Sequence, residues 1–114
     1  MVILYGIPNC NTMKKARQWL EEHGIEYRFH NYKKDGVDPG KLDAWLEQLG
    51  WETLVNRRGT TWRKLPEEDR DNLDTAKAKA LMLANPSLIK RPVLEWEGGV
   101  IAGFDPRQYG ALFV

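Results

Sequence analysis

The fold is decided within residues 3–16, which read ILYGIPNCNTMKKA. An apolar run ends at Gly6 and Pro8, Cys10 follows as the single cysteine of the chain, and a helical pattern begins directly after it. This order predicts that a buried strand passes at Cys10 into the first turn of a helix. Such a turn presents unpaired backbone N–H groups and the positive end of the helix dipole, which favour a thiolate, the reactive form of cysteine.

The residues alone leave two interpretations of Cys10 open. A lone cysteine is commonly a small buried apolar side chain without chemistry of its own. Here the neighbours Asn9, Asn11 and Thr12 are polar, and the position is a turn rather than an apolar face. Both facts favour a reactive thiol. The Thr12 hydroxyl is a candidate hydrogen-bond donor to the sulfur, although an ordinary first-turn residue fits the pattern equally well.

Composition restricts the class of protein. A chain of 114 residues fits one domain with its own core. Its single cysteine can form no internal disulfide, and proteins without disulfides are typical of a reducing compartment. No secretory-signal pattern and no membrane-length apolar run is seen. The net charge is +1 and 29% of the residues are charged, so the chain lacks the overall excess of positive charge that is typical of nucleic-acid-binding proteins. We therefore expect a cytoplasmic monomer that binds neither membranes nor nucleic acid.

Apolar periodicity and turn signals predict a βαβ half, a run of helices and a ββα half. Strands are expected at 2–6, 25–32, 92–96 and 100–104. Helices are expected at 11–23, 39–49, 73–84 and 106–112, with helical turns at 51–55 and 62–70, a polar turn at 33–37 and a loop at 56–61. This order predicts an α/β, thioredoxin-like fold with a four-stranded mixed sheet. Residues 1–114 would form one domain with a helical insertion at roughly 38–85.

Metal and dithiol chemistry are both disfavoured. His23 and His30 have no second cysteine or carboxylate at metal-ligand spacing, so we expect no metal. Cys10 is followed by Asn11, Thr12 and Met13, so the chain lacks a Cys-x-x-Cys pair. A redox cycle at Cys10 must therefore be completed by an external thiol, for which glutathione is the natural candidate. We expect no bound cofactor.

Three features together resemble the arsenate reductase family of the glutaredoxin-coupled type. They are a cysteine after the first strand, a helical insertion, and Arg91-Pro92 before a hairpin. The stretches at 6–12, 58–65 and 89–92 are similar to the YffB branch, whose proteins are described as arsenate-reductase-like with a proposed glutathione-dependent thiol reductase role. The Spx regulators, which bind RNA polymerase, belong to the same superfamily. The resemblance covers essentially the whole chain.

The resemblance implies roles for individual residues. It makes Cys10 the nucleophile, places Arg91 beside the thiolate, and makes Pro92 the cis proline of thioredoxin-like folds. From the residues alone, Arg91 is better explained as a surface charge at a strand start, and the resemblance reverses that interpretation. The candidate catalytic residues are Cys10, Arg58 and Arg91, and the candidate substrate-binding residues are Asn9, Asn11, Thr12, Arg57 and Pro92.

The sequence departs from the arsenate reductases at two further arginines of that family. Asn56 stands at the first position, and Arg57 and Arg58 follow it. Either arginine is a candidate replacement, which of them faces inward is left open, and a solvated basic turn is the alternative. Gly103-Phe104 stands at the second position. Losing fixed positive charge weakens oxyanion stabilisation, which argues against arsenate as the native substrate.

The expected function is that of a glutathione-dependent thiol-disulfide oxidoreductase with Cys10 as its nucleophile. Glutathione would serve as co-substrate and partner, and glutaredoxin is a further candidate partner. The rival hypothesis is an Spx-like, non-enzymatic regulator that binds a protein partner such as RNA polymerase. A true arsenate reductase is the third hypothesis.

Overall fold

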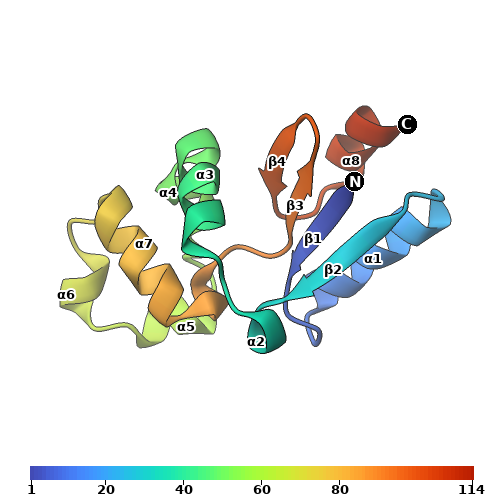
Figure 1. Ribbon diagram of the computed structural model, residues 1–114. Coiled ribbons are helices and arrows are strands. Elements are labelled where there is room, and N and C mark those ends of the chain that lie inside the picture. The colour runs from blue at the N-terminus through green and yellow to red at the C-terminus, as the bar shows by residue number, and fades with distance from the viewer. The chain divides into compact units, whose positions relative to one another are not determined.

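In the computed structural model, which describes residues 1–114, the N-terminal and C-terminal parts of the chain together form a four-stranded sheet (Figure 1). The chain divides into a sheet unit, made of residues Met1–Asp35 and Arg91–Val114, and a helical unit, Gly36–Lys90. The prediction of one domain with an insertion at about 38–85 stays a prediction. No helix is long and apolar enough to cross a lipid bilayer.

The sheet unit has the thioredoxin-like topology that the sequence predicts. Its strands lie in the order β2-β1-β3-β4, with β1 parallel to β2 and the other neighbours antiparallel. The strands are β1 Val2–Gly6, β2 Tyr27–Asn31, β3 Val93–Trp96 and β4 Gly99–Ala102. The helices are α1 Asn11–Glu22, α2 Tyr32–Asp35 and α8 Pro106–Phe113.

The register of the sheet separates two sets of side chains. Leu4 of β1 pairs with Phe29 of β2 and with Leu94 of β3. These residues belong to the core that α1 and α8 complete, because alternate residues of a strand face the same side of a sheet. The buried members of this core are Val2, Leu4, Met13, Ala16, Leu20, Leu94 and Tyr109. The next residue, Tyr5, pairs with His30 and projects from the opposite face.

The end of α1 follows from its glycine. The N–H of Gly24 donates to the Glu21 carbonyl at 3.2 Å, and the N–H of Ile25 donates to the Leu20 carbonyl at 2.9 Å. This pair of bonds is a Schellman motif, which requires a left-handed residue, and Gly24 supplies it at φ 68°. Ile25 is therefore part of the helix stop, which explains why β2 begins at Tyr27 instead of the predicted residue 25.

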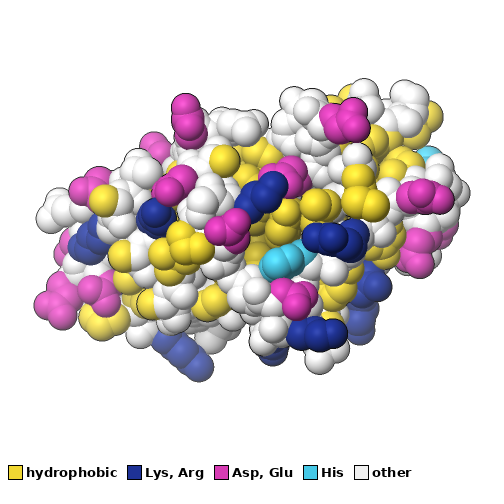
Figure 2. Space-filling view, in the orientation of Figure 1, with side chains coloured by type: hydrophobic (Ala, Val, Ile, Leu, Met, Phe, Trp, Pro, Cys, Tyr) yellow, Lys and Arg dark blue, Asp and Glu magenta, His cyan; other side chains and the backbone are white.

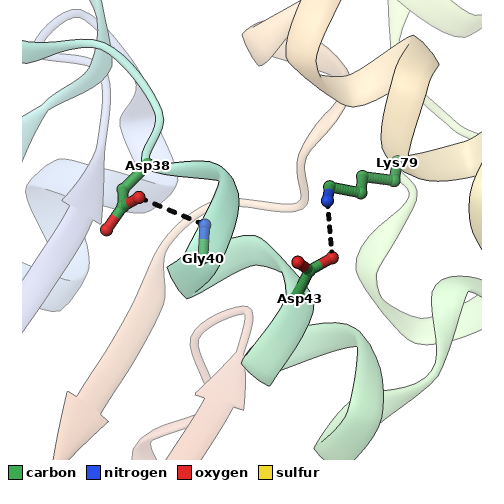
Figure 3. A network of polar contacts seen from close by, with 4 residues as sticks. All are labelled: Asp38, Gly40, Asp43 and Lys79. Carbon is green, nitrogen blue, oxygen red and sulfur yellow. Dashed lines mark hydrogen bonds and ion pairs between the residues drawn. The ribbon is translucent and has the colours of Figure 1, made fainter.

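The helical unit contains α3 Pro39–Leu49, α4 Trp51–Leu54, α5 Thr60–Lys64, α6 Glu67–Arg70, α7 Thr75–Ala84 and the 3₁₀ turn η1 Pro86–Leu88. Asp38 caps α3 by accepting from the Gly40 N–H at 3.1 Å, and Lys79 of α7 pairs with Asp43 of α3 at 2.8 Å (Figure 3). Asp74 caps α7 by accepting from a backbone N–H at 2.7 Å, so this helix begins after residue 74, not at 73.

One short element differs in kind from its prediction. Tyr32–Asp35 forms the helix α2 in a segment predicted as the end of a strand and a polar turn. The side chain of Asn31 accepts from the Lys33 N–H at 2.9 Å, which turns the chain away from the strand direction.

On the face seen in Figure 2, Lys and Arg side chains are interspersed with Asp and Glu, as the near-neutral net charge leads one to expect.

The close approach of β1 to α1 at Gly6 generates the first prediction. A Cβ at Gly6 would collide with Sδ of Met13 and lie 2.8 Å from its Cε, and the Met13 side chain is fully buried. We expect Gly6→Ala to lower the free energy of unfolding by about 1–3 kcal/mol, the usual cost of overpacking a core. Urea denaturation followed by tryptophan fluorescence measures this.

Gly110→Ala is the matched control for this substitution. Gly110 lies within α8, and nothing stands within 4 Å of a Cβ at this position. Because alanine is the better helix former, we expect this control to be neutral or to gain roughly 0.5–1 kcal/mol. An unfolding free energy of Gly6→Ala equal to that of the native protein would refute the packing argument.

Candidate thiol site

Cys10 occupies the N-cap position of α1. Its backbone is extended, with φ −126° and ψ 129°, and its carbonyl accepts the first helical hydrogen bond from the Lys14 N–H at 3.0 Å. The thiol is free and half-buried, and it packs against the core of the sheet unit. The Cys10 side chain makes no N-cap hydrogen bond to the helix, so the backbone N–H groups of the first turn of α1 are available to stabilise a thiolate.

The surroundings of Cys10 favour its ionised form. Burial alone pushes the pKa of the thiol up. The backbone N–H of Met13, a hydrogen bond from the Arg91 side chain, the backbone N–H of Thr12 and the Arg91 charge together outweigh burial and hold the pKa below that of an ordinary thiol. Thr12 thus contributes through its backbone N–H, and a role of its hydroxyl, which the sequence left open, stays a prediction.

Arg91 reaches the thiol from the start of β3. The Arg91–Pro92 peptide bond is cis, and the Pro92 carbonyl accepts from the Gly103 N–H at 2.8 Å. Because β3 is antiparallel to β1, its first residues lie at the edge of the sheet where β1 ends and Cys10 follows. Cys10, Thr12, Arg91 and Pro92 are therefore gathered at one edge of the sheet unit.

The remaining predicted residues lie elsewhere or on the surface. Asn9 and Asn11 are exposed on either side of Cys10. Arg57 and Arg58 belong to the helical unit, where they border a cavity of about 360 Å³. That cavity is lined by Glu52, Thr53, Val55, Asn56, Arg57, Arg58 and Lys90. The roles of these four predicted residues stay predictions.

The two arginines of the cavity have different surroundings. The guanidinium of Arg57 lies over the ring of Trp51, 5.8 Å from its centroid. The backbone N–H of Arg58 donates to the Asn56 side chain at 3.2 Å, which holds the turn that carries both arginines. The aromatic contact restrains Arg57, so Arg58 is the better candidate to contact an anionic ligand.

At Gly103-Phe104, which the resemblance aligns with a further arginine of the arsenate reductases, the structure has a packing contact. Gly103 follows β4 with φ 87°, a left-handed conformation that suits glycine. Phe104 then packs edge-on against Tyr109, with ring centroids 4.9 Å apart. Position 104 therefore contributes to the core and supplies no positive charge to the thiol site.

The histidines take part in aromatic contacts. The ring of His23 stacks on Trp19 with centroids 3.9 Å apart, and Nδ1 lies 2.8 Å from the Trp19 carbonyl oxygen at the end of α1. The ring of His30 lies 5.0 Å from that of Tyr5. No group of three or more His, Cys, Asp or Glu residues is arranged to hold a metal ion.

The family model of the ArsC family matches residues 5–112, from β1 to α8. The chain belongs to the ArsC family. A solved structure named YFFB (PA3664) protein is similar over 100% of both chains, with 53% identity and a TM-score of 0.97. An arsenate reductase (ArsC) related protein from Brucella melitensis is 60% identical over 98% of this chain and 93% of its own, with a TM-score of 0.79.

The relatives also include transcriptional regulators. The global transcriptional regulator Spx of Listeria innocua is 32% identical over 92% of this chain and 81% of its own length. The predicted resemblance to the arsenate reductase family and its YffB and Spx-like members is thus confirmed, and so is the thioredoxin-like fold.

Arg91 generates the second prediction. Arg91→Met removes both the hydrogen bond and the charge that stabilise the Cys10 thiolate. The pKa of the thiol should rise, so the half-point of alkylation should move to higher pH and the rate at pH 7 should fall severalfold. The measurement is the rate of iodoacetamide alkylation between pH 4 and pH 10.

Arg107→Met controls for the loss of one positive charge. Arg107 is exposed in the first turn of α8, and its substitution should leave the pH dependence of Cys10 alkylation unchanged. A profile of Arg91→Met that coincides with that of the native protein would show that the guanidinium does not act on Cys10.

Proposed function

We propose that this chain is a glutathione-linked thiol-disulfide oxidoreductase. The observation that carries the proposal is the lowered pKa of Cys10, which faces backbone N–H groups of α1 and the Arg91 side chain. The thiolate is the form of cysteine that attacks disulfides, and a lowered pKa increases its share at a given pH. Membership of the ArsC family supports thiol redox chemistry, because its members include proteins named arsenate reductase related.

The proposed reaction has two balanced steps. The Cys10 thiolate attacks one sulfur of a disulfide, a Cys10 mixed disulfide forms, and the other sulfur leaves as a thiolate that takes a proton from water. A glutathione thiolate then attacks the mixed disulfide at the substrate sulfur, which releases Cys10 as a thiolate and the substrate as its glutathione disulfide. The chain has a single cysteine, so an external thiol must perform the second step.

Reduction of arsenate is a less favourable assignment. Stabilising an oxyanion in a reaction needs several fixed donors, each often worth a few kcal/mol. In the sheet unit, Phe104 packs into the core where the arsenate reductases carry an arginine. We therefore expect little or no arsenate-dependent oxidation of glutathione.

Intact mass spectrometry tests the proposed function as the third prediction. After exposure to oxidised glutathione, the native protein should gain one glutathionyl group in place of the thiol proton, and reduced glutathione should remove it. Cys10→Ser should gain nothing and should lose turnover in a coupled disulfide reduction assay. Full activity of Cys10→Ser, or no adduct on the native protein, would overturn the assignment.

The two neighbouring arginines supply the fourth prediction. Because Arg57 rests on Trp51, we expect Arg58→Met to slow the reaction of Cys10 with oxidised glutathione more than Arg57→Met does. Losing one charged hydrogen bond to a ligand commonly costs about 1.5–3 kcal/mol, so the expected decrease is roughly tenfold or more. Equal rates for Arg58→Met and the native protein would remove Arg58 from the site.

A regulator that acts through a protein partner is the second candidate function. The 32% identity to the Spx regulator over most of both chains favours it. This hypothesis needs no lowered pKa of Cys10, and it predicts no disulfide turnover. It also predicts that RNA polymerase subunits are retained on the immobilised chain, independently of Cys10→Ser.

A further inference from the structure

The cavity of about 360 Å³ in the helical unit is lined by more positive charge than its own residues neutralise. Arg57, Arg58 and Lys90 contribute three cations to its walls, and Glu52 contributes the single carboxylate. No ion pair joins Glu52 to any of the three cations. Three cations against one carboxylate leave the cavity with a net charge of +2, which its walls do not neutralise.

Backbone hydrogen bonds hold the two segments that form this cavity against each other. The N–H of Asn56 donates to the Leu88 carbonyl at 2.8 Å. The N–H of Lys90 donates to the Leu54 carbonyl, also at 2.8 Å. Val55 lies between the two bonds, is buried, and forms the apolar part of the lining. The segment after α4 and the segment after η1 are thus fixed at backbone level, which places the three cations around one cavity.

Two of the three cations are available to a ligand. The guanidinium of Arg57 lies over the Trp51 ring, whereas the side chains of Arg58 and Lys90 have neither an ion pair nor an aromatic contact. A guanidinium and an ammonium carry only hydrogen-bond donors, and carboxylate oxygens are among their strongest acceptors. Arg58 and Lys90 are therefore suited to bind one carboxylate each.

Glu52 distinguishes this cavity from a general anion site. A carboxylate in the wall repels a simple anion such as phosphate and attracts an ammonium group. A ligand that complements all of these charges therefore carries two carboxylates and one ammonium. The volume of about 360 Å³ lies within the range of small-molecule sites, roughly 300–1,000 Å³.

We propose that this cavity binds a small zwitterion with two carboxylates and one ammonium, the charge pattern of glutamate and of γ-glutamyl peptides such as glutathione. Arg58 and Lys90 bind the carboxylates, and Glu52 binds the ammonium. All of these residues belong to the helical unit, so the inference uses neither Cys10 nor the proposed thiol chemistry.

Ligands that differ in one group test this assignment. Glutarate has the carbon chain and both carboxylates of glutamate but lacks the ammonium, and S-methylglutathione keeps all three charged groups while its sulfur is blocked. Amide chemical shifts, followed by NMR at constant ionic strength, give the dissociation constants. We expect glutamate to bind at least threefold more tightly than glutarate, with shift changes concentrated at residues 52–58 and 90. Whichever of glutamate and S-methylglutathione binds more tightly identifies the source of the ligand.

Lys90→Met is the informative variant, because it removes one carboxylate contact. We expect the dissociation constants of glutamate and of S-methylglutathione to rise roughly tenfold, the effect of one hydrogen bond between charged groups. Lys64→Met is the matched control: Lys64 is an exposed lysine at the end of α5 in the same unit, and it does not line the cavity. Its dissociation constants should equal those of the native protein.

Glu52→Gln tests the ammonium contact separately. This variant should bind glutarate more tightly than the native protein does, and it should lose the preference for glutamate over glutarate. Equal affinities of the native protein for the two ligands would reduce the cavity to a plain anion site and overturn the proposal. No binding of any ligand, or an equal loss in Lys90→Met and Lys64→Met, would overturn it as well.

The zwitterion site and the thiol chemistry fail in different ways. If Cys10 forms the glutathione adduct but neither glutamate nor S-methylglutathione binds, the proposed function stands and the zwitterion site is wrong. If a zwitterion binds through Lys90 and no adduct forms, the site stands and the proposed function is wrong.

Discussion

The sheet unit depends on the contact between the end of β1 and the start of α1. Gly6 lets the fully buried Met13 side chain lie directly against the strand, and the backbone of the same residue presents its N–H to Cys10. Met13 therefore connects the core, through its side chain, with the thiol, through its backbone N–H. Because interiors are close-packed, a displaced Met13 side chain would also displace the backbone that stabilises the thiolate.

Local sequence signals account for most of the elements. The apolar run of β1, the stripe of α1 and the Asp-Pro starts of α3 and α8 depend on neighbours in the chain, and the structure has them where the pattern predicts them. The differences occur where one side chain redirects the backbone. Asn31 turns the chain into α2, and Asp74 moves the start of α7. Short-range hydrogen bonds of this kind shift element boundaries without changing apolar periodicity.

The candidate site was only partly accessible from sequence. The position of Cys10 at a strand-to-helix turn follows from local pattern, but the partner Arg91 was suggested by a family resemblance, since a lone arginine before a proline carries no signal of its own. The stacking of Tyr32 of α2 on Tyr5 of β1 was also not predicted, because only the register of the sheet brings the two rings together. Tertiary contacts of this kind leave no mark in a single sequence.

The sheet unit is built from two stretches that lie before and after the helical unit in the sequence. During synthesis Cys10 therefore precedes Arg91 and β3 by the whole helical unit. The Tyr5 hydroxyl must find Glu95 across 90 positions of sequence before the sheet is complete. Such long-range pairing is slow compared with helix formation. A nascent chain therefore carries the Cys10 thiol without its guanidinium partner until the residues after the helical unit have been made, and Arg91 lowers the pKa of Cys10 only from then on.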